Sequence, residues 1–124
     1  MDAVKRCLDT YALVEIAEAN PKFSKYLNVE FIITNLTLVE FYAVLLRQKG
    51  EDTADYWYKK LEPYSAYLDL KLLIDAVKFR FMNRKLNLSF FDAVGYVFAL
   101  KNGFYFVTGD KAFERLKNVE YIKK

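Results

Sequence analysis

Residues 104–113 read Phe-Tyr-Phe-Val-Thr-Gly-Asp-Lys-Ala-Phe, an apolar run that ends in a hydroxyl residue, a glycine and an aspartate. The continuous apolar run Phe104–Val107 is typical of a buried strand, and Gly103 predicts the turn into it. A short helix is expected to follow over Ala112–Leu116. A strand followed directly by a helix is the repeating unit of an open parallel sheet.

The rest of the chain repeats this alternation of strands and helices. We predict further strands over Val4–Leu8, Val29–Thr34, Ala66–Leu68 and Val119–Ile122. We predict helices over Thr10–Ala19, Thr37–Gln48, Asp52–Leu61, Leu70–Met82 and Phe90–Lys101, and a helical turn over Phe23–Leu27. In the Leu70–Met82 helix, Leu73, Val77 and Met82 are expected on one face. The pattern favours a parallel sheet with helices on both faces.

Length and composition restrict the class of protein. The 124 residues suit one domain, residues 1–124. The composition is 54% hydrophobic and 18% aromatic, which excludes a disordered chain. No apolar stretch is long enough to span a bilayer, and the N-terminal residues lack a secretory pattern, so we expect a cytoplasmic protein. Cys7, the single cysteine, fits a reducing compartment and is interpreted as a small buried hydrophobic residue.

The chain contains no histidine, which removes the commonest general base and the commonest transition-metal ligand. Four carboxylates, Asp9, Glu40, Asp92 and Asp110, each lie where an apolar run ends and a helix is predicted to begin. A hydrolytic site built from them would use oxygen ligands and a hard cation such as Mg²⁺ or Mn²⁺.

Each acid also has a structural interpretation. The pairs Thr37–Glu40 and Ser89–Asp92 have the spacing of a capping box, and Asp9 and Asp110 can cap the helices that follow them. Capping does not require the four acids to meet. In an open parallel sheet, however, the strand-to-helix junctions lie at one edge. Like charges gathered there repel unless a cation binds between them, so the sequence favours a metal site.

The ordered motifs of this chain resemble those of the PIN-domain ribonucleases, especially the VapC-type toxins. The resemblance covers nearly the whole sequence. Its motifs are Leu8-Asp9-Thr10, the Thr-x-x-Glu helix start at Glu40, Leu88-Ser89-Phe90-Phe91-Asp92-Ala93, and Val107-Thr108-Gly109-Asp110-Lys111-Ala112-Phe113. The order of the motifs is more specific than any one of them.

The resemblance implies a three-layer α/β/α sandwich with a central parallel sheet and metal-dependent endonucleolytic cleavage of RNA. It assigns Asp9, Glu40, Asp92 and Asp110 as metal ligands and catalytic residues. It also implies homodimers and, in the toxins, an antitoxin whose tail crosses the active cleft and the helical arm, here Asp52–Leu61. Many relatives have a further acid where this chain has Ala112, so we expect one firmly bound ion.

In the expected mechanism, water attacks a phosphodiester in line while the ion neutralises charge. Asp92 or Glu40 is expected to accept the proton, and Lys111 and Arg115 to hold flanking phosphates. Thr108 is expected either to orient a carboxylate or a metal-bound water, or to stabilise its turn.

Two alternatives belong to other classes. The first is a receiver-like phosphoacceptor domain, which usually needs a lysine where this chain has Thr108-Gly109-Asp110. The second is a non-catalytic module that binds RNA or protein with the same fold.

Overall fold

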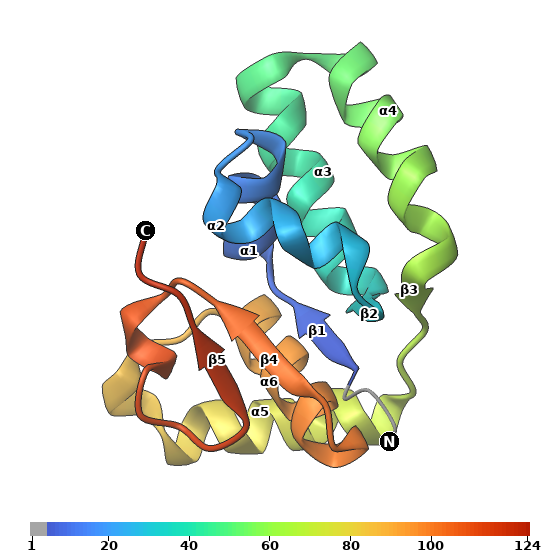
Figure 1. The fold of residues 1–124 in the computed structure, drawn as a ribbon. Coiled ribbons are helices and arrows are strands. Elements are labelled where there is room, and N and C mark those ends of the chain that lie inside the picture. The colour runs from blue at the N-terminus through green and yellow to red at the C-terminus, as the bar shows by residue number, and fades with distance from the viewer. Residues whose placement is uncertain (1–4) are drawn as a thin grey trace.

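The computed structural model describes residues 5–124, which form a parallel sheet between two layers of helices (Figure 1). Its strands are β1 (Arg6–Leu8), β2 (Phe31–Thr34), β3 (Ser65–Ala66), β4 (Tyr105–Thr108) and β5 (Val119–Tyr121). Its helices are α1 (Thr10–Ala17), α2 (Pro21–Ser24), α3 (Asn35–Lys49), α4 (Glu51–Leu61), α5 (Leu70–Met82) and α6 (Phe90–Asn102). Four 3₁₀ turns, η1 (Lys25–Asn28), η2 (Glu62–Tyr64), η3 (Arg84–Leu86) and η4 (Lys111–Phe113), join some of these elements.

The strand order β3-β2-β1-β4-β5 places the first strand at the centre of the sheet. Every pairing is parallel, and β1 pairs on one side with β2 and on the other with β4. The carboxyl ends of all five strands therefore lie at the same edge of the sheet. Strands β1, β2 and β4 are each followed directly by a helix or a 3₁₀ turn there.

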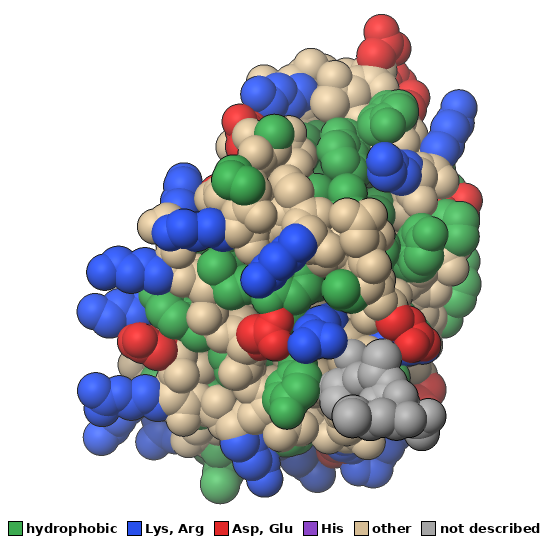
Figure 2. Space-filling view, in the orientation of Figure 1, with side chains coloured by type: hydrophobic (Ala, Val, Ile, Leu, Met, Phe, Trp, Pro, Cys, Tyr) green, Lys and Arg blue, Asp and Glu red, His purple; other side chains and the backbone are tan. Residues whose placement is uncertain are grey.

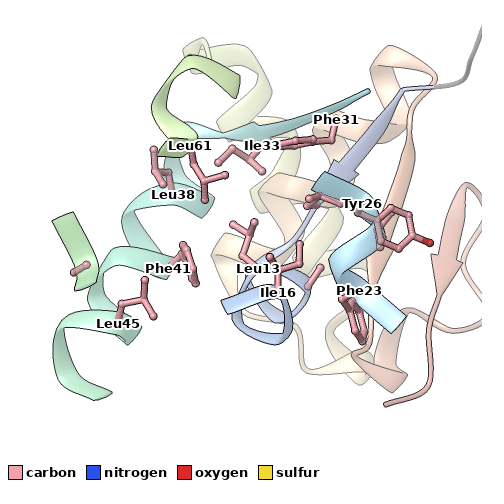
Figure 3. Close-up of a cluster of buried hydrophobic side chains, with 14 residues drawn as sticks. Leu13, Ile16, Phe23, Tyr26, Phe31, Ile33, Leu38, Phe41, Leu45 and Leu61 are labelled. Atoms are coloured by element: carbon pink, nitrogen blue, oxygen red, sulfur yellow. The ribbon is translucent and has the colours of Figure 1, made fainter. Parts of the chain in front are cut away.

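Successive side chains of a strand point to opposite faces, and each face of this sheet has its own core. Leu8 and Val107 pack with side chains of α1–α4, and Figure 3 shows the largest part of that cluster. Cys7 and Phe106 point the other way, into a cluster with α5 and α6. These two cores confirm the predicted α/β/α sandwich with a parallel sheet.

Most predicted elements are present, with shifted ends. The helix expected from Thr37 begins at Asn35, and the one expected over Ala112–Leu116 is the 3₁₀ turn η4. Val4, the first residue of the first predicted strand, lies outside the described residues. Cys7 is completely buried, as predicted. Within residues 5–124 no helix is both long enough and apolar enough to cross a membrane.

Candidate active site

Asp9 lies at the carboxyl end of β1 and is almost completely buried, with 2% of its surface exposed. It is the N-cap of α1, because its Oδ1 accepts a hydrogen bond of 2.8 Å from the Ala12 N–H. The capping interpretation is therefore correct for this oxygen. The other oxygen, Oδ2, is buried and has no hydrogen-bond partner among the residues that the structure describes.

Glu40 lies in α3, but the capping box predicted for it is wrong. The N-cap of α3 is Thr34, whose hydroxyl oxygen accepts from the Thr37 N–H at 3.0 Å. Because the helix begins before Thr37, Glu40 lies one turn beyond the capped N–H groups. Its carboxylate instead accepts a hydrogen bond from the Thr10 hydroxyl, on α1. This bond directs Glu40 towards the end of β1.

Asp92 lies in the first turn of α6. Ser89 is the N-cap of this helix, as predicted, and its hydroxyl oxygen accepts a hydrogen bond of 3.1 Å from the Asp92 N–H. Because this bond is made by the backbone N–H of Asp92, the cap fixes the position of the Asp92 backbone in the first turn of the helix.

Asp110 follows β4, and its Oδ1 accepts a hydrogen bond of 3.0 Å from the Ala112 N–H at the start of η4. Thr108 is completely buried, and its hydroxyl oxygen accepts from the Asp110 N–H at 2.9 Å. Thr108 therefore stabilises the turn that carries Asp110. It also lies beside Asp9, where its hydroxyl favours the charged form of that carboxyl.

Burial and neighbouring charges shift the pKa values of two of these carboxyl groups, Asp9 and Asp92. Burial raises the pKa of Asp9 well above its ordinary value, and the negative charges of Asp92 and Asp110 raise it further. The Thr108 hydroxyl and the Ala12 N–H act in the opposite direction and lower it in part. Burial, followed by the charges of Glu40 and Asp110, raises the pKa of Asp92 to about 6. Asp92 therefore interacts electrostatically with all three other acids, so the structure brings the four predicted residues to one edge of the sheet.

The donors gathered at this edge suit a hard divalent cation, because all are carboxylate or hydroxyl oxygens. The buried, unpaired Oδ2 of Asp9 is an available ligand atom, and a cation beside it would relieve both its desolvation and the mutual repulsion. In the described part of the chain, however, no three Asp, Glu or Cys side chains already form a group that could hold an ion. The residues fit such an ion by chemistry and by position, and their side chains do not form a completed cage.

The basic residues predicted to contact phosphates border this edge. Lys111 and Arg115 are exposed in and just after η4, the turn that Asp110 caps. In Figure 2, lysine and arginine side chains line the left and lower margins of the view, where the C-terminal segment and α5 lie in Figure 1. Thr10 was not predicted as a site residue, although its place directly after Asp9 at a helix start is a signal for a residue of this edge.

The family comparison finds that a model of the PIN domain matches residues 6–119. No curated protein matches the chain.

Solved structures with a similar fold cover almost the whole chain. VapC20 of Mycobacterium tuberculosis, described as a sarcin-ricin loop cleaving toxin, is 15% identical with a TM-score of 0.79, over 96% of this chain and 98% of that one. A DNA-bound VapBC of Salmonella typhimurium is 17% identical with a TM-score of 0.74, over 97% and 98%. A toxin–antitoxin complex of Klebsiella pneumoniae is 15% identical with a TM-score of 0.72, over 94% and 99%. At these identities the likeness is one of fold.

Proposed function

Since the chain belongs to the PIN-domain family, we propose that it is a metal-dependent endoribonuclease of the VapC type, the toxin of a type II toxin–antitoxin pair. The observation that carries this proposal is the buried Oδ2 of Asp9, which has no hydrogen-bond partner among the described residues and lies at the sheet edge where the other acids gather. A charge arrangement of this kind lowers the stability of the metal-free protein, so it is expected where a cation is bound.

Asp9, Glu40, Asp92 and Asp110 would hold the ion, Mg²⁺ or Mn²⁺. When bound, it supplies charge neutralisation at the phosphate and lowers the pKa of water. Ala112 stands where many relatives have a further acid, so one ion is proposed.

Two of the acids are candidates for accepting the proton of the attacking water. Asp92 is proposed for this role, because the carboxylate of the other candidate is already engaged by a hydroxyl group. Glu40 already accepts the Thr10 hydroxyl, so its proposed role is to keep a fixed ligand oxygen at the end of β1. Thr108 positions Asp110 through the backbone of the turn.

Lys111 and Arg115 are proposed to bind the RNA phosphates on either side of the scissile bond. Both are exposed and lie just after Asp110. Contacts of this kind orient the strand without reading its sequence.

The antitoxin is proposed to bind the helical arm. A groove of about 450 Å³ lies between α3 and α4, with Leu38, Val39, Tyr42, Tyr58 and Tyr67 in its lining. Tyr67 is 84% exposed, far more than a tyrosine packed within its own fold. An apolar segment of a second protein would cover these rings.

The test is co-expression with the product of an adjacent short reading frame and purification of the complex. Tyr67→Glu is expected to abolish the complex.

A homodimer is proposed through the first half of α5. Leu72 and Ala76 face the core, whereas Leu70 and Ile74 form an exposed apolar stripe on the other side of the helix. A stripe of this kind is stabilised when a second copy covers it. Light scattering after size exclusion is expected to show a dimer, and Ile74→Lys a monomer.

The direct test of activity is cleavage of labelled single-stranded RNA by the purified protein with Mg²⁺, Mn²⁺ or EDTA. Cleavage with either ion and none with EDTA is the expected result. Cleavage that persists in EDTA would contradict metal dependence, and no cleavage of any RNA with either ion would favour the non-catalytic alternative. Membership of the PIN-domain family argues against the receiver-like alternative.

A further inference from the structure

A second hollow, of about 400 Å³, lies beside the start of α6, outside the four acids. It is formed by the end of α5, the turn η3 and the first residue of α6. Among the residues that line it are Arg80, Phe81, Arg84 and Phe90. None of them has a role in the proposed acidic site.

Arg80 is held at this hollow by one bond and keeps its other donors available. Its Nε donates a hydrogen bond of 2.7 Å to the carbonyl oxygen of Leu88, a buried residue just before the α6 cap. Its two terminal amino groups make no ion pair or hydrogen bond to any residue in the described range 5–124. A fixed guanidinium with free terminal donors matches the geometry of a phosphate group.

Arg84 is the second cation of the hollow. Its guanidinium carbon lies 4.9 Å from the centre of the Phe81 ring, and its Nη1 donates a hydrogen bond of 3.1 Å to the Phe81 carbonyl oxygen. Within the described chain, no carboxylate forms an ion pair with it or with Arg80. The Phe81 ring is 65% exposed, so one of its faces remains available for stacking.

The fold places this hollow beside the acidic edge. Helices α5 and α6 pack as an antiparallel pair, because Lys101 near the end of α6 pairs with Asp75, while the Phe79 and Tyr96 rings meet at 5.1 Å further along. The end of α5 therefore adjoins the start of α6, where Asp92 lies. Phe90 precedes Asp92 by two residues and lies on the other side of the helix, so the hollow and Asp92 are separated by about one helix diameter, roughly 10 Å.

Two cations without a counter-charge beside an exposed ring are the components that bind one phosphate–base unit of single-stranded RNA. We propose that Arg80, Arg84 and Phe81 form a subsite for the RNA strand a few nucleotides from the scissile bond. The two guanidinium groups bind a phosphate, and a base stacks on Phe81 near Phe90. The identity of the ligand as RNA rests on the proposed function.

The test measures binding separately from cleavage. The anisotropy of a labelled single-stranded RNA of about 12 nucleotides is followed in EDTA, at several salt concentrations. Arg84→Glu is compared with Lys78→Glu, which makes the same change of charge on an exposed residue of α5 outside the hollow. Arg84→Glu is expected to raise Kd about tenfold and to reduce the salt slope by about 0.7, the value for one phosphate on a single strand. Lys78→Glu is expected to raise Kd less than about threefold.

Phe81→Leu keeps every charge and removes the stacking surface. We expect it to raise Kd by about fivefold or more, as for loss of one base–aromatic stack. If circular dichroism shows that Arg84→Glu does not fold, binding by Phe81→Leu tests the subsite by itself. Equal effects of Arg84→Glu and Lys78→Glu, or an unchanged Kd for Phe81→Leu, would overturn the subsite.

The subsite and the nuclease function can fail separately. If the wild type binds RNA through Arg84 but cuts none with Mg²⁺ or Mn²⁺, the subsite stands and the nuclease function falls. If the wild type cuts RNA and Arg84→Glu leaves KM for the same RNA unchanged, the subsite falls and the function stands. With the subsite present, Arg84→Glu raises KM about tenfold and leaves kcat nearly unchanged, because it weakens binding away from the reacting atoms.

Discussion

The ring of Tyr11 lies directly over Gly109, so a Cβ atom built at Gly109 would come within 2.1 Å of a Tyr11 ring carbon. Tyr11 is two residues from Asp9, and Gly109 directly precedes Asp110. This contact therefore joins the two loops that carry central acids of the candidate site. It also gives the physical reason for a glycine in the Thr108-Gly109-Asp110 turn.

We expect Gly109→Ala to lower the free energy of unfolding by about 1–3 kcal/mol, because the methyl group displaces the Tyr11 ring. Urea denaturation measures the loss. In a Tyr11→Ala background the same substitution should cost much less, as a double-mutant cycle would show. Equal costs in both backgrounds would mean that the ring is not the obstacle.

Asp92→Asn is expected to abolish metal-dependent RNA cleavage while the fold is kept. The free energy of unfolding without metal should stay level or rise by up to about 3 kcal/mol, since the substitution removes a partly buried charge near three others. Cleavage and thermal denaturation are measured together. Asp69→Asn is the matched control, because Asp69 caps α5 through the Leu72 N–H and is no part of the site. An active or an unfolded Asp92→Asn protein would refute the assignment.

Mg²⁺ or Mn²⁺ should stabilise the folded protein, because only the native chain gathers the four acids. At an ion concentration of about 100 times Kd, the free energy of unfolding rises by about 2.7 kcal/mol, which thermal denaturation detects as a higher Tm. Asp9→Asn should remove most of this gain by replacing the buried ligand oxygens with an amide. If neither ion changes the Tm of the wild type, the result would argue against the metal site.

The metal-free protein should become more stable as the pH falls from about 6 towards 4. The folded pKa of Asp92, about 6, lies above the ordinary 3.8, so the native state binds more protons than the unfolded state in this window. Stability therefore decreases as pH rises through it. Urea midpoints in EDTA measure the effect, and Asp92→Asn should reduce it, leaving the part that the raised pKa of Asp9 contributes. Below about pH 4, loss of the Asp75 pairs with Lys101 and Lys71 opposes the trend, since they lower the pKa of Asp75 to about 2.

The sequence predicted the fold well where local signals were strong. Leu70–Met82 has the predicted bounds, with Asp69 as its cap, and Phe90–Asn102 differs by one residue. The predicted start of α3 was wrong, because Thr34 and Thr37 both suit a cap. In the structure β2 ends at Thr34, and this residue caps the helix. The periodicity of apolar residues also did not identify the buried face of α5. Leu72 and Ala76 are buried, while Val77 and Met82, predicted to share a face with Leu73, are exposed.

The candidate acids could be found from the sequence because each follows a strand or opens a helix. Their coupling and the unpaired Oδ2 of Asp9 could not, because both depend on burial between distant segments. In the sequence, Arg80 and Arg84 are only two of the basic residues that gather near the end of α5, with Lys78 and Lys85. Their common hollow depends on the bend after α5, where Asn87 adopts a left-handed backbone with φ of 55°.

The pairing of β1 with β4 joins two segments that lie far apart along the chain. During translation, Asp9 therefore leaves the ribosome long before the strand beside it and Asp110 do. The acidic edge consequently cannot assemble until β4 and the turn after it have also emerged. A chain interrupted between Asp9 and β4 contains the first acid of the edge but not the proposed site.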